Sequence, residues 1–149
     1  MAQKKYGLKV VNIRLVKERT LYSITQVRSP DTAMKVVQEF MSDFDREALG
    51  VLCVDNAGNV LNVHFCAVGA LDRCIFDPKQ IFKATLLSNA AGILVFHNHP
   101  SGDLTPSKED VNSTKRLKEA CTLMDISFLD HIIIGSNGCY YSFMENQIL

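Results

Sequence analysis

One stretch of the chain, residues 97–110, carries the residue types of a metal site. His97 and His99 end an apolar run, and because side chains alternate along a strand, both imidazoles are expected on the same side. A Pro-Ser-Gly turn and a Thr-Pro pair follow, which is typical of a helix start whose first turn carries Asp110. Two imidazoles and a carboxylate are three ligands for a divalent cation. Three protein ligands with one position left for water form the catalytic pattern of zinc sites, whereas structural zinc sites have four protein ligands.

A metal site of this kind needs a base, and Glu47 is the candidate. Metal binding lowers the pKa of a bound water to about 7, so a carboxylate within reach can take its proton. Glu47 directly precedes the apolar run 48–54, and a strand there, lying beside the histidine strand, would place the carboxylate at the same rim of the sheet. The other upstream carboxylates, Glu39, Asp43 and Asp45, are expected on a helix or a loop without that position.

Ser107 has two interpretations. It stands three residues before Asp110, so the two side chains share one face of the first helical turn. Its hydroxyl could donate a hydrogen bond to the oxyanion that develops on a scissile carbonyl. Alternatively, Ser107 caps the helix by accepting a hydrogen bond from a backbone N–H group.

Other polar residues near the motif have plainer interpretations. Asp130 and His131 are neighbours in a predicted strand, so they face opposite sides and form no simple relay; a structural or supporting role is expected for them. His64 is expected within a hairpin as a surface or packing residue. Asp103 lies in a turn, where aspartate commonly satisfies its own backbone.

Hydrophobic periodicity and turn residues predict the elements that position these groups. Strands are predicted over residues 8–15, 48–54, 60–68, 93–97, 128–134 and 139–143. Helices are predicted from Pro30 (capped by Ser29 or Asp31) to Met41, from Asp77-Pro78 to about Asn89, and from Pro106 to about Met124. Their inner faces are predicted to carry Ala33, Val36, Val37, Phe40 and Met41; Ile81, Phe82, Thr85 and Leu86; and Val111, Thr114, Leu117, Cys121 and Met124. This order predicts an α/β/α sandwich around a mixed β-sheet.

Composition limits the function classes. A chain of 149 residues with 47% hydrophobic content is expected to form a single domain, residues 1–149, with its own core. Lys+Arg and Asp+Glu balance at 16 each, so charge does not support DNA as a partner. The hydrophobicity pattern of the sequence predicts neither a signal peptide nor an apolar segment long enough to span a membrane. The five cysteines form no CxxC pair, so Cys66 and Cys74 are poor metal ligands, and reduced thiols of a cytoplasmic protein are expected.

The motif also carries a family resemblance. Glu47 ahead of an apolar strand, followed by His97-x-His99-Pro-x6-Ser107-x2-Asp110, resembles the JAMM (MPN+, JAB1-type) metalloprotease motif. The longer motif His-Asn-His-Pro-Ser-Gly, with Asp-His-Ile-Ile-Ile-Gly and Tyr-Tyr-Ser-Phe further along the chain, resembles the RadC branch of that family. The similarity covers about residues 30–149.

The resemblance implies a cytidine-deaminase-like fold (JAB/MPN), with zinc (Zn²⁺) held by His97, His99 and Asp110. It also implies Glu47 as general acid and base and Ser107 as oxyanion donor, in a site that cleaves amide or isopeptide bonds. Full-length members of the RadC branch carry a DNA-contacting helix-hairpin-helix module. None is expected here, because only about 30 residues precede the similarity.

These observations predict a zinc-dependent metallohydrolase, a peptidase or isopeptidase with a peptide or protein substrate. One alternative is a DNA-repair-associated protein of the RadC family, which the balanced charge disfavours. The other is a non-enzymatic interaction module on the same scaffold, which the complete ligand set disfavours. The sequence indicates neither the substrate's identity nor the oligomeric state.

Overall fold

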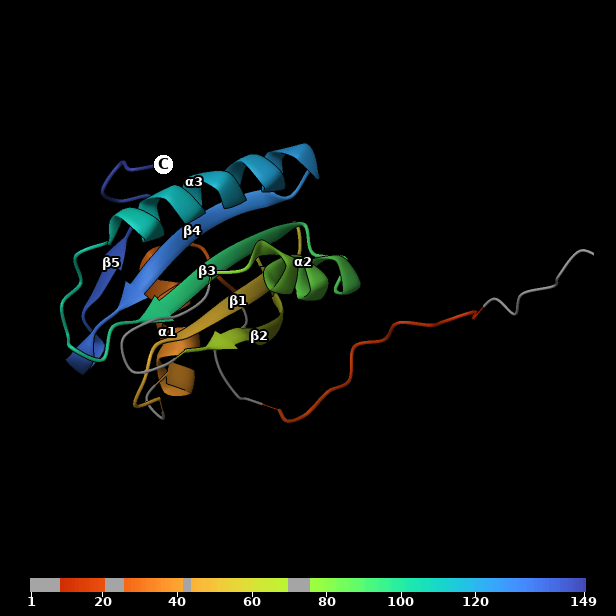
Figure 1. Ribbon diagram of the computed structural model, residues 1–149, viewed down its shortest axis with the longest axis horizontal. Coiled ribbons are helices and arrows are strands. Elements are labelled where there is room, and N and C mark those ends of the chain that lie inside the picture. Colours follow the sequence, from red (N-terminus) through yellow and green to blue (C-terminus); the bar gives the residue numbers. More distant parts are fainter. Residues whose placement is uncertain (1–8, 21–25, 42–43, 70–75) are drawn as a thin grey trace, which may run out of the picture.

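A five-stranded mixed sheet forms the centre of the protein (Figure 1). The computed structural model describes residues 9–20, 26–41, 44–69 and 76–149. Its strands are β1 (Ala48–Val54), β2 (Val60–Val68), β3 (Gly92–Asn98), β4 (Ser127–Ile134) and β5 (Tyr140–Ser142). Its helices are α1 (Pro30–Met41), α2 (Pro78–Leu87) and α3 (Lys108–Leu123), with a 3-10 turn, η1, at Ser136–Gly138. The strand order is β2-β1-β3-β4-β5; β3 and β4 are parallel, and the other described neighbours are antiparallel.

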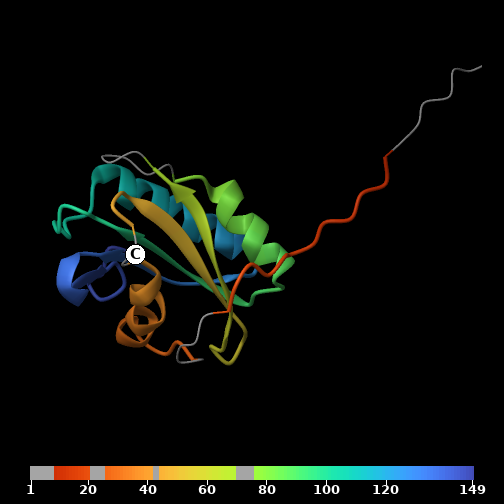
Figure 2. The same cartoon turned by 90° about the horizontal axis from the view of Figure 1, so that it is seen from below.

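Helices cover both faces of this sheet, α1 on one side and α2 with α3 on the other (Figures 1 and 2). Each face has its own apolar core. The α1 side includes Leu52, Leu94 and Phe96, and the α2/α3 side includes Val51 and Val95. Adjacent residues of one strand belong to opposite cores because strand side chains alternate. The predicted α/β/α sandwich around a mixed sheet is confirmed.

The sheet register decides where the histidine strand delivers its side chains. Along β3, Ile93 and Val95 pack in the core under α2 and α3, so His97 continues on that same side. Strand β1 runs antiparallel to β3 and places Leu49 opposite His97. The residue that precedes β1, Glu47, therefore comes to the end of β3 at which His97 lies.

Gly50 is required by a close approach within the sheet. It lies opposite Phe96 in the β1–β3 ladder, and a Cβ atom at residue 50 would lie 2.3 Å from the Phe96 ring. The Phe96 side chain is fully buried. The aromatic ring thus occupies the space of the missing side chain, which explains a glycine in an otherwise apolar, fully buried strand.

The helix starts follow the predicted chemistry. Ser29 accepts a hydrogen bond from the Thr32 N–H group at 3.2 Å at the start of α1. Asp77 accepts one from the Lys79 N–H group at 3.0 Å at the start of α2. Helix α3 begins at Lys108, two residues later than predicted, because Ser107 rather than an earlier residue is its N-cap.

The inner faces of the helices were predicted correctly in most positions. The predicted set on α1 is buried throughout. On α2, however, Leu86 is 54% exposed and Ala84 is buried in its place. Leu86 lies roughly 140° around the helix from Ile81, outside the buried stripe. Met124 is 45% exposed because it is the C-cap of α3, beyond the last helical turn.

The strand predicted over residues 8–15 is wrong for residues 9–15, while Leu8 lies outside the described residues. Residues 9–20 form no regular element and extend away from the sheet (Figures 1 and 2). Val10 is 95% exposed and Val16 is 83% exposed. Branched residues favour a strand only where a neighbouring backbone completes the hydrogen bonds. The chain reaches the turn between β1 and β2 later, where Gln26 forms an isolated antiparallel bridge with Asn59.

None of the helices in the described part of the chain is long and apolar enough to cross a membrane.

Candidate metal centre

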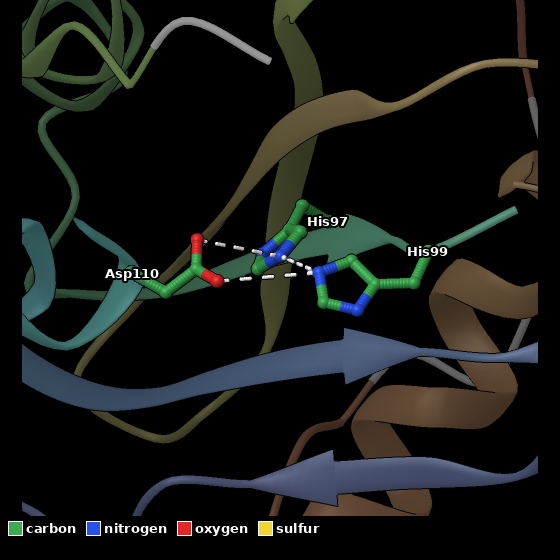
Figure 3. A group of neighbouring side chains, drawn as sticks. All are labelled: His97, His99 and Asp110. Carbon is green, nitrogen blue, oxygen red and sulfur yellow. Dashed lines mark hydrogen bonds and ion pairs between the residues drawn. The ribbon is translucent and has the colours of Figure 1, made fainter. Parts of the chain in front are cut away.

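The three predicted ligands converge where β3 ends and α3 begins (Figure 3). His97 is the penultimate residue of β3, His99 follows the strand, and Asp110 lies in the first turn of α3. The Nε2 atoms of the two histidines are 2.9 Å apart. Asp110 Oδ1 lies 3.6 Å from His97 Nε2, and Asp110 Oδ2 lies 4.0 Å from His99 Nε2. One ligand atom from each residue therefore faces a common point.

This donor set fits a divalent cation. Two ligand atoms about 2.0 Å from a tetrahedral zinc ion lie about 3.3 Å from each other, close to the separations seen here. Two bare imidazole nitrogens at 2.9 Å would present lone pairs to one another. A cation between them satisfies both nitrogens and the Asp110 carboxylate together. The His97, His99 and Asp110 cluster can therefore bind a metal ion.

His99 is oriented by the turn that follows it. Its Nδ1 atom faces the backbone carbonyl of Asp103, so Nδ1 carries the proton and Nε2 is left to the cluster. The turn closes through a 2.9 Å hydrogen bond from Gly102 N–H to the His99 carbonyl, with Gly102 at a φ of +82°. The Asp103 carboxylate accepts from Thr105 N–H at 2.9 Å, so it satisfies local backbone as predicted.

His97 is buried, and its protonation state follows from that. Burial lowers the pKa of His97 to about 4; the neighbouring His99 acts in the same direction, and the Asp110 carboxylate opposes it. The His97 imidazole is therefore neutral near pH 7, which is the form that binds a metal. Its second nitrogen, Nδ1, lies 2.7 Å from Nε2 of His131.

Asp110 is held by a capping box at the start of α3. Its backbone N–H donates to Ser107 Oγ at 3.0 Å, and the Ser107 backbone N–H donates to Asp110 Oδ2 at 2.8 Å. The Ser107 hydroxyl also donates to Oδ2, at 2.7 Å. Of the two interpretations of Ser107, the capping role is therefore present in the structure. The same contacts fix Oδ2 and leave Oδ1 directed towards His97.

Glu47 shares a small cavity with the cluster. The cavity is lined by Glu47, Leu49, Phe76, His97 and Asp110. The prediction that the strand after Glu47 lies beside the histidine strand is confirmed by the β1–β3 ladder. The structure thus brings the predicted base to the wall of the cavity on which two of the three ligands lie.

Asn98 was not singled out from the sequence, yet it holds the backbone on both sides of Glu47. Its Oδ1 accepts from Ala48 N–H at 2.7 Å, and its Nδ2 donates to the Arg46 carbonyl at 3.0 Å. Asn98 is 6% exposed. The sequence signal for this role is the position of Asn98 between two histidines at the end of a strand. Side-chain alternation turns Asn98 to the opposite side from the histidines, and an amide that is buried there needs hydrogen-bond partners.

The pair Asp130–His131 divides as expected for opposite faces of a strand. Asp130 accepts hydrogen bonds from Ser142 Oγ at 2.5 Å, Met144 N–H at 3.0 Å and the His131 N–H at 2.7 Å. Burial raises the pKa of Asp130, and these hydrogen bonds oppose that rise. Asp130 therefore has a structural role that joins β4 to the segment around β5.

The residues that the sequence set aside lie away from the cluster or outside the described part. Asp45 forms an exposed ion pair with Arg46 at 2.8 Å. His64 is exposed on β2. Asp43, Cys74 and the Glu39 side chain lie outside what the structure describes.

Comparison with known proteins places the chain in a family. The model of the RadC-like JAB domain matches residues 27–148. A UPF0758 protein of Thermotoga maritima is 41% identical over 117 residues, which cover 77% of this chain and 52% of that protein. UPF0758 proteins of Roseiflexus castenholzii and Clostridium tetani are each 42% identical, over 83% and 86% of this chain and 52% and 54% of their own length. The chain thus spans about half the length of the curated relatives it matches. The chain belongs to the RadC-like JAB domain family.

Proposed function

We propose that the protein is a zinc-dependent metallohydrolase, a peptidase or isopeptidase that attacks its substrate with water. The observation that carries this proposal is the convergence of His97, His99 and Asp110 beside a cavity that is lined by His97, Asp110 and Glu47. Two imidazoles and one carboxylate are ligand types of zinc sites, and three protein ligands leave a position for chemistry. Bound zinc supplies a Lewis acid that polarises a carbonyl and lowers the pKa of water.

Glu47 is the proposed proton carrier. It takes one proton from the attacking water while the water oxygen bonds to the carbonyl carbon of the substrate. It then returns that proton to the amine nitrogen as the C–N bond breaks. The reaction consumes one water and releases a carboxylic acid and an amine, so a single carboxylate serves as base and then as acid. The Asn98 contacts on either side of Glu47 support this role because they fix the backbone that carries it.

Ser107 is the proposed donor to the developing oxyanion. Its hydroxyl has one proton, which it now donates to Asp110 Oδ2. It can turn to a substrate only by leaving that oxygen. The Ser107 backbone N–H donates to the same oxygen at 2.8 Å, so the carboxylate stays held when the hydroxyl turns. Because Asp110 is held by two contacts, the Ser107 hydroxyl can turn to the substrate while Asp110 keeps its orientation.

The proposed substrate is a peptide or protein, and the proposed location is the cytoplasm. Leu49 and Phe76 give the cavity two apolar walls beside its polar residues, a mixture suited to an amide with flanking side chains. The balanced charge of the chain supports a peptide rather than DNA. Cys53, Cys121 and Cys139 are thiols, which supports a reducing compartment.

Metal content and turnover test the proposal together. Because three ligands converge on one point, purified protein should contain about one zinc ion per chain. Elemental mass spectrometry measures this metal content. His97→Ala and Asp110→Ala should lose the metal. Glu47→Gln should keep the metal and lose turnover of fluorogenic peptide and ε-amino-linked isopeptide libraries.

The matched control is His64→Ala, which removes an exposed histidine of β2 and should change neither metal content nor turnover. A pure wild-type protein that takes up no stoichiometric zinc at neutral pH would overturn the metal site. Full turnover in Glu47→Gln with zinc retained would overturn the role of Glu47.

A further inference from the structure

A buried row of hydrogen bonds lies behind the metal cluster and joins two of its ligands. His97 Nδ1 lies 2.7 Å from His131 Nε2, and His131 Nδ1 lies 2.6 Å from Thr114 Oγ1. Thr114 Oγ1 in turn donates to the backbone carbonyl of Asp110 at 2.5 Å. His131 and Thr114 are both fully buried. The row therefore runs from the ligand on β3, through β4, to the ligand on α3, without an exposed link between them.

The hydrogen bonds of this row can be donated in one direction only, because the group at one end is a carbonyl. The Asp110 carbonyl can only accept, so the single Thr114 hydroxyl proton points towards it. His131 Nδ1 must then donate to Thr114 Oγ1. A neutral His131 with its proton on Nδ1 has a bare Nε2, which accepts from His97. The proton of His97 therefore sits on Nδ1, and its Nε2 is bare and faces His99 and Asp110.

The surroundings of His131 hold it in this role. The His131 ring stacks on the Phe143 ring, with the ring centres 4.6 Å apart and the planes at 15° to each other. The centre of the Phe76 ring lies 5.9 Å from that of His131, and the two planes are tilted relative to each other. Both of its nitrogens are engaged by an imidazole and a hydroxyl rather than by a carboxylate. The stacked ring and the two hydrogen bonds together fix the plane of the His131 ring.

We propose that His131 and Thr114 are positioning residues of the metal site. They hold His97 in the tautomer that presents Nε2 to a metal, and they tie the β3 ligand to the α3 ligand. The inference rests on the proposed function in that the site is taken to bind zinc. The tautomer it assigns to His97, however, is a property of the metal-free protein and can be measured without zinc.

The direct test is the proton position on His97, read from two-bond proton–nitrogen correlations of ¹⁵N-histidine-labelled, metal-free protein. Wild type should show His97 protonated on Nδ1. His131→Phe keeps a flat ring on Phe143 but removes both hydrogen bonds, so His97 should shift towards protonation on Nε2. The exposed-site control His64→Phe should leave the His97 signal unchanged.

Zinc affinity is the second readout, measured by competition with a chromophoric chelator. Loss of a partner that orients a metal ligand typically weakens metal binding about 10- to 100-fold, and His131→Phe should fall in that range. Thr114→Val keeps the shape of the side chain without its hydroxyl and should also weaken zinc binding. Thr114→Ser keeps the hydroxyl and should bind zinc as wild type does. If His131→Phe does not fold, the Thr114 pair tests the same row.

The outcomes separate the two proposals. Wild-type zinc binding, with an unchanged His97 tautomer and unchanged affinity in the His131→Phe and Thr114→Val variants, would overturn the positioning role and leave the proposed function intact. Absence of zinc binding in wild type would overturn the proposed function. The tautomer shift in His131→Phe would in that case still support the positioning of His97.

Discussion

Ser107 and Asp110 hold each other at the first turn of α3 in a reciprocal capping box. The Asp110 N–H donates to Ser107 Oγ at 3.0 Å while the Ser107 N–H donates to Asp110 Oδ2 at 2.8 Å. A contact that starts the helix therefore also orients a candidate metal ligand, so helix stability and the proposed metal binding depend on the same pair.

The first prediction is that Ser107→Ala lowers both the stability of the fold and turnover. Loss of the cap should lower the free energy of unfolding by about 1 kcal/mol, measured by urea denaturation of the metal-free protein. If the hydroxyl also donates to the oxyanion, turnover should fall by about 10²- to 10³-fold. Ser107→Thr keeps the hydroxyl and should restore most of both. Normal turnover in a destabilised Ser107→Ala protein would leave capping as its whole role.

The second prediction concerns pH. Burial lowers the pKa of His97 to about 4 and lowers the pKa of His131 well below its ordinary value, whereas an unfolded chain titrates its histidines near 6.5. As the pH falls from about 6.5 towards about 4, the unfolded chain binds protons that the folded chain does not, so stability is lost. The free energy of unfolding of metal-free protein should fall by up to about 1.4 kcal/mol per pH unit for each histidine.

Urea denaturation at several pH values from about 7 to about 5 measures this slope. His131→Phe removes one of the two groups and should give a shallower slope. His64→Ala, at an exposed position of β2, is the control variant measured over the same pH range. A wild-type stability that is flat over this range would contradict the neutral, buried state of both histidines.

The third prediction concerns Asn98, whose amide bonds to the backbone on both sides of Glu47. Asn98→Ala leaves those backbone groups without this partner and should cost about 1–3 kcal/mol of stability. Glu47 should then be misplaced, so turnover should fall more steeply than zinc content, measured on the same samples. An equal fall in zinc content and turnover would instead mean that Asn98 acts through its histidine neighbours.

The fourth prediction separates core packing from the site. Gly50→Ala places a Cβ atom against the Phe96 ring, at 2.3 Å before any adjustment, and overpacking of this kind costs about 1–3 kcal/mol. Phe96→Leu should relieve that clash, so the double variant should lose less stability than the two single variants summed. Both residues face away from the cluster, and zinc content should be unchanged. Additive losses in the double variant would show that the clash is relieved by other movements.

The fifth prediction tests the exposed N-terminal segment. Val10, Ile13 and Val16 are 95%, 72% and 83% exposed. Replacing all three by serine should change the free energy of unfolding by less than about 0.5 kcal/mol for each site, because no packed contact is lost. A large loss of stability would show that this segment packs as a strand after all.

Local patterns in the sequence were enough to predict the ligand spacing and most of the secondary structure of this protein. The two-residue spacing of His97 and His99 at the end of a strand, and the three-residue spacing of Ser107 and Asp110 at the start of a helix, match periods of two and 3.6 residues, and recognising them needs no tertiary information. The same periods predicted the strands of the sheet and most of the buried helix faces. They failed for residues 9–15, because a strand exists only where another backbone pairs with it, and no local pattern reveals whether such a neighbour is present.

The tertiary structure decided which distant residues meet. Antiparallel pairing of β1 with β3 brought Glu47 to the cluster, as expected from its place before an apolar strand. The contacts of His131 with His97 and Thr114 join three successive elements, β4, β3 and α3, across 34 and 17 residues of chain, and the packing of these elements sets the distances. The amide of Asn98 found its partners in the same way. Ligand types and spacing are local properties of the chain, whereas the groups that orient those ligands depend on strand register and helix packing, which only the folded core specifies.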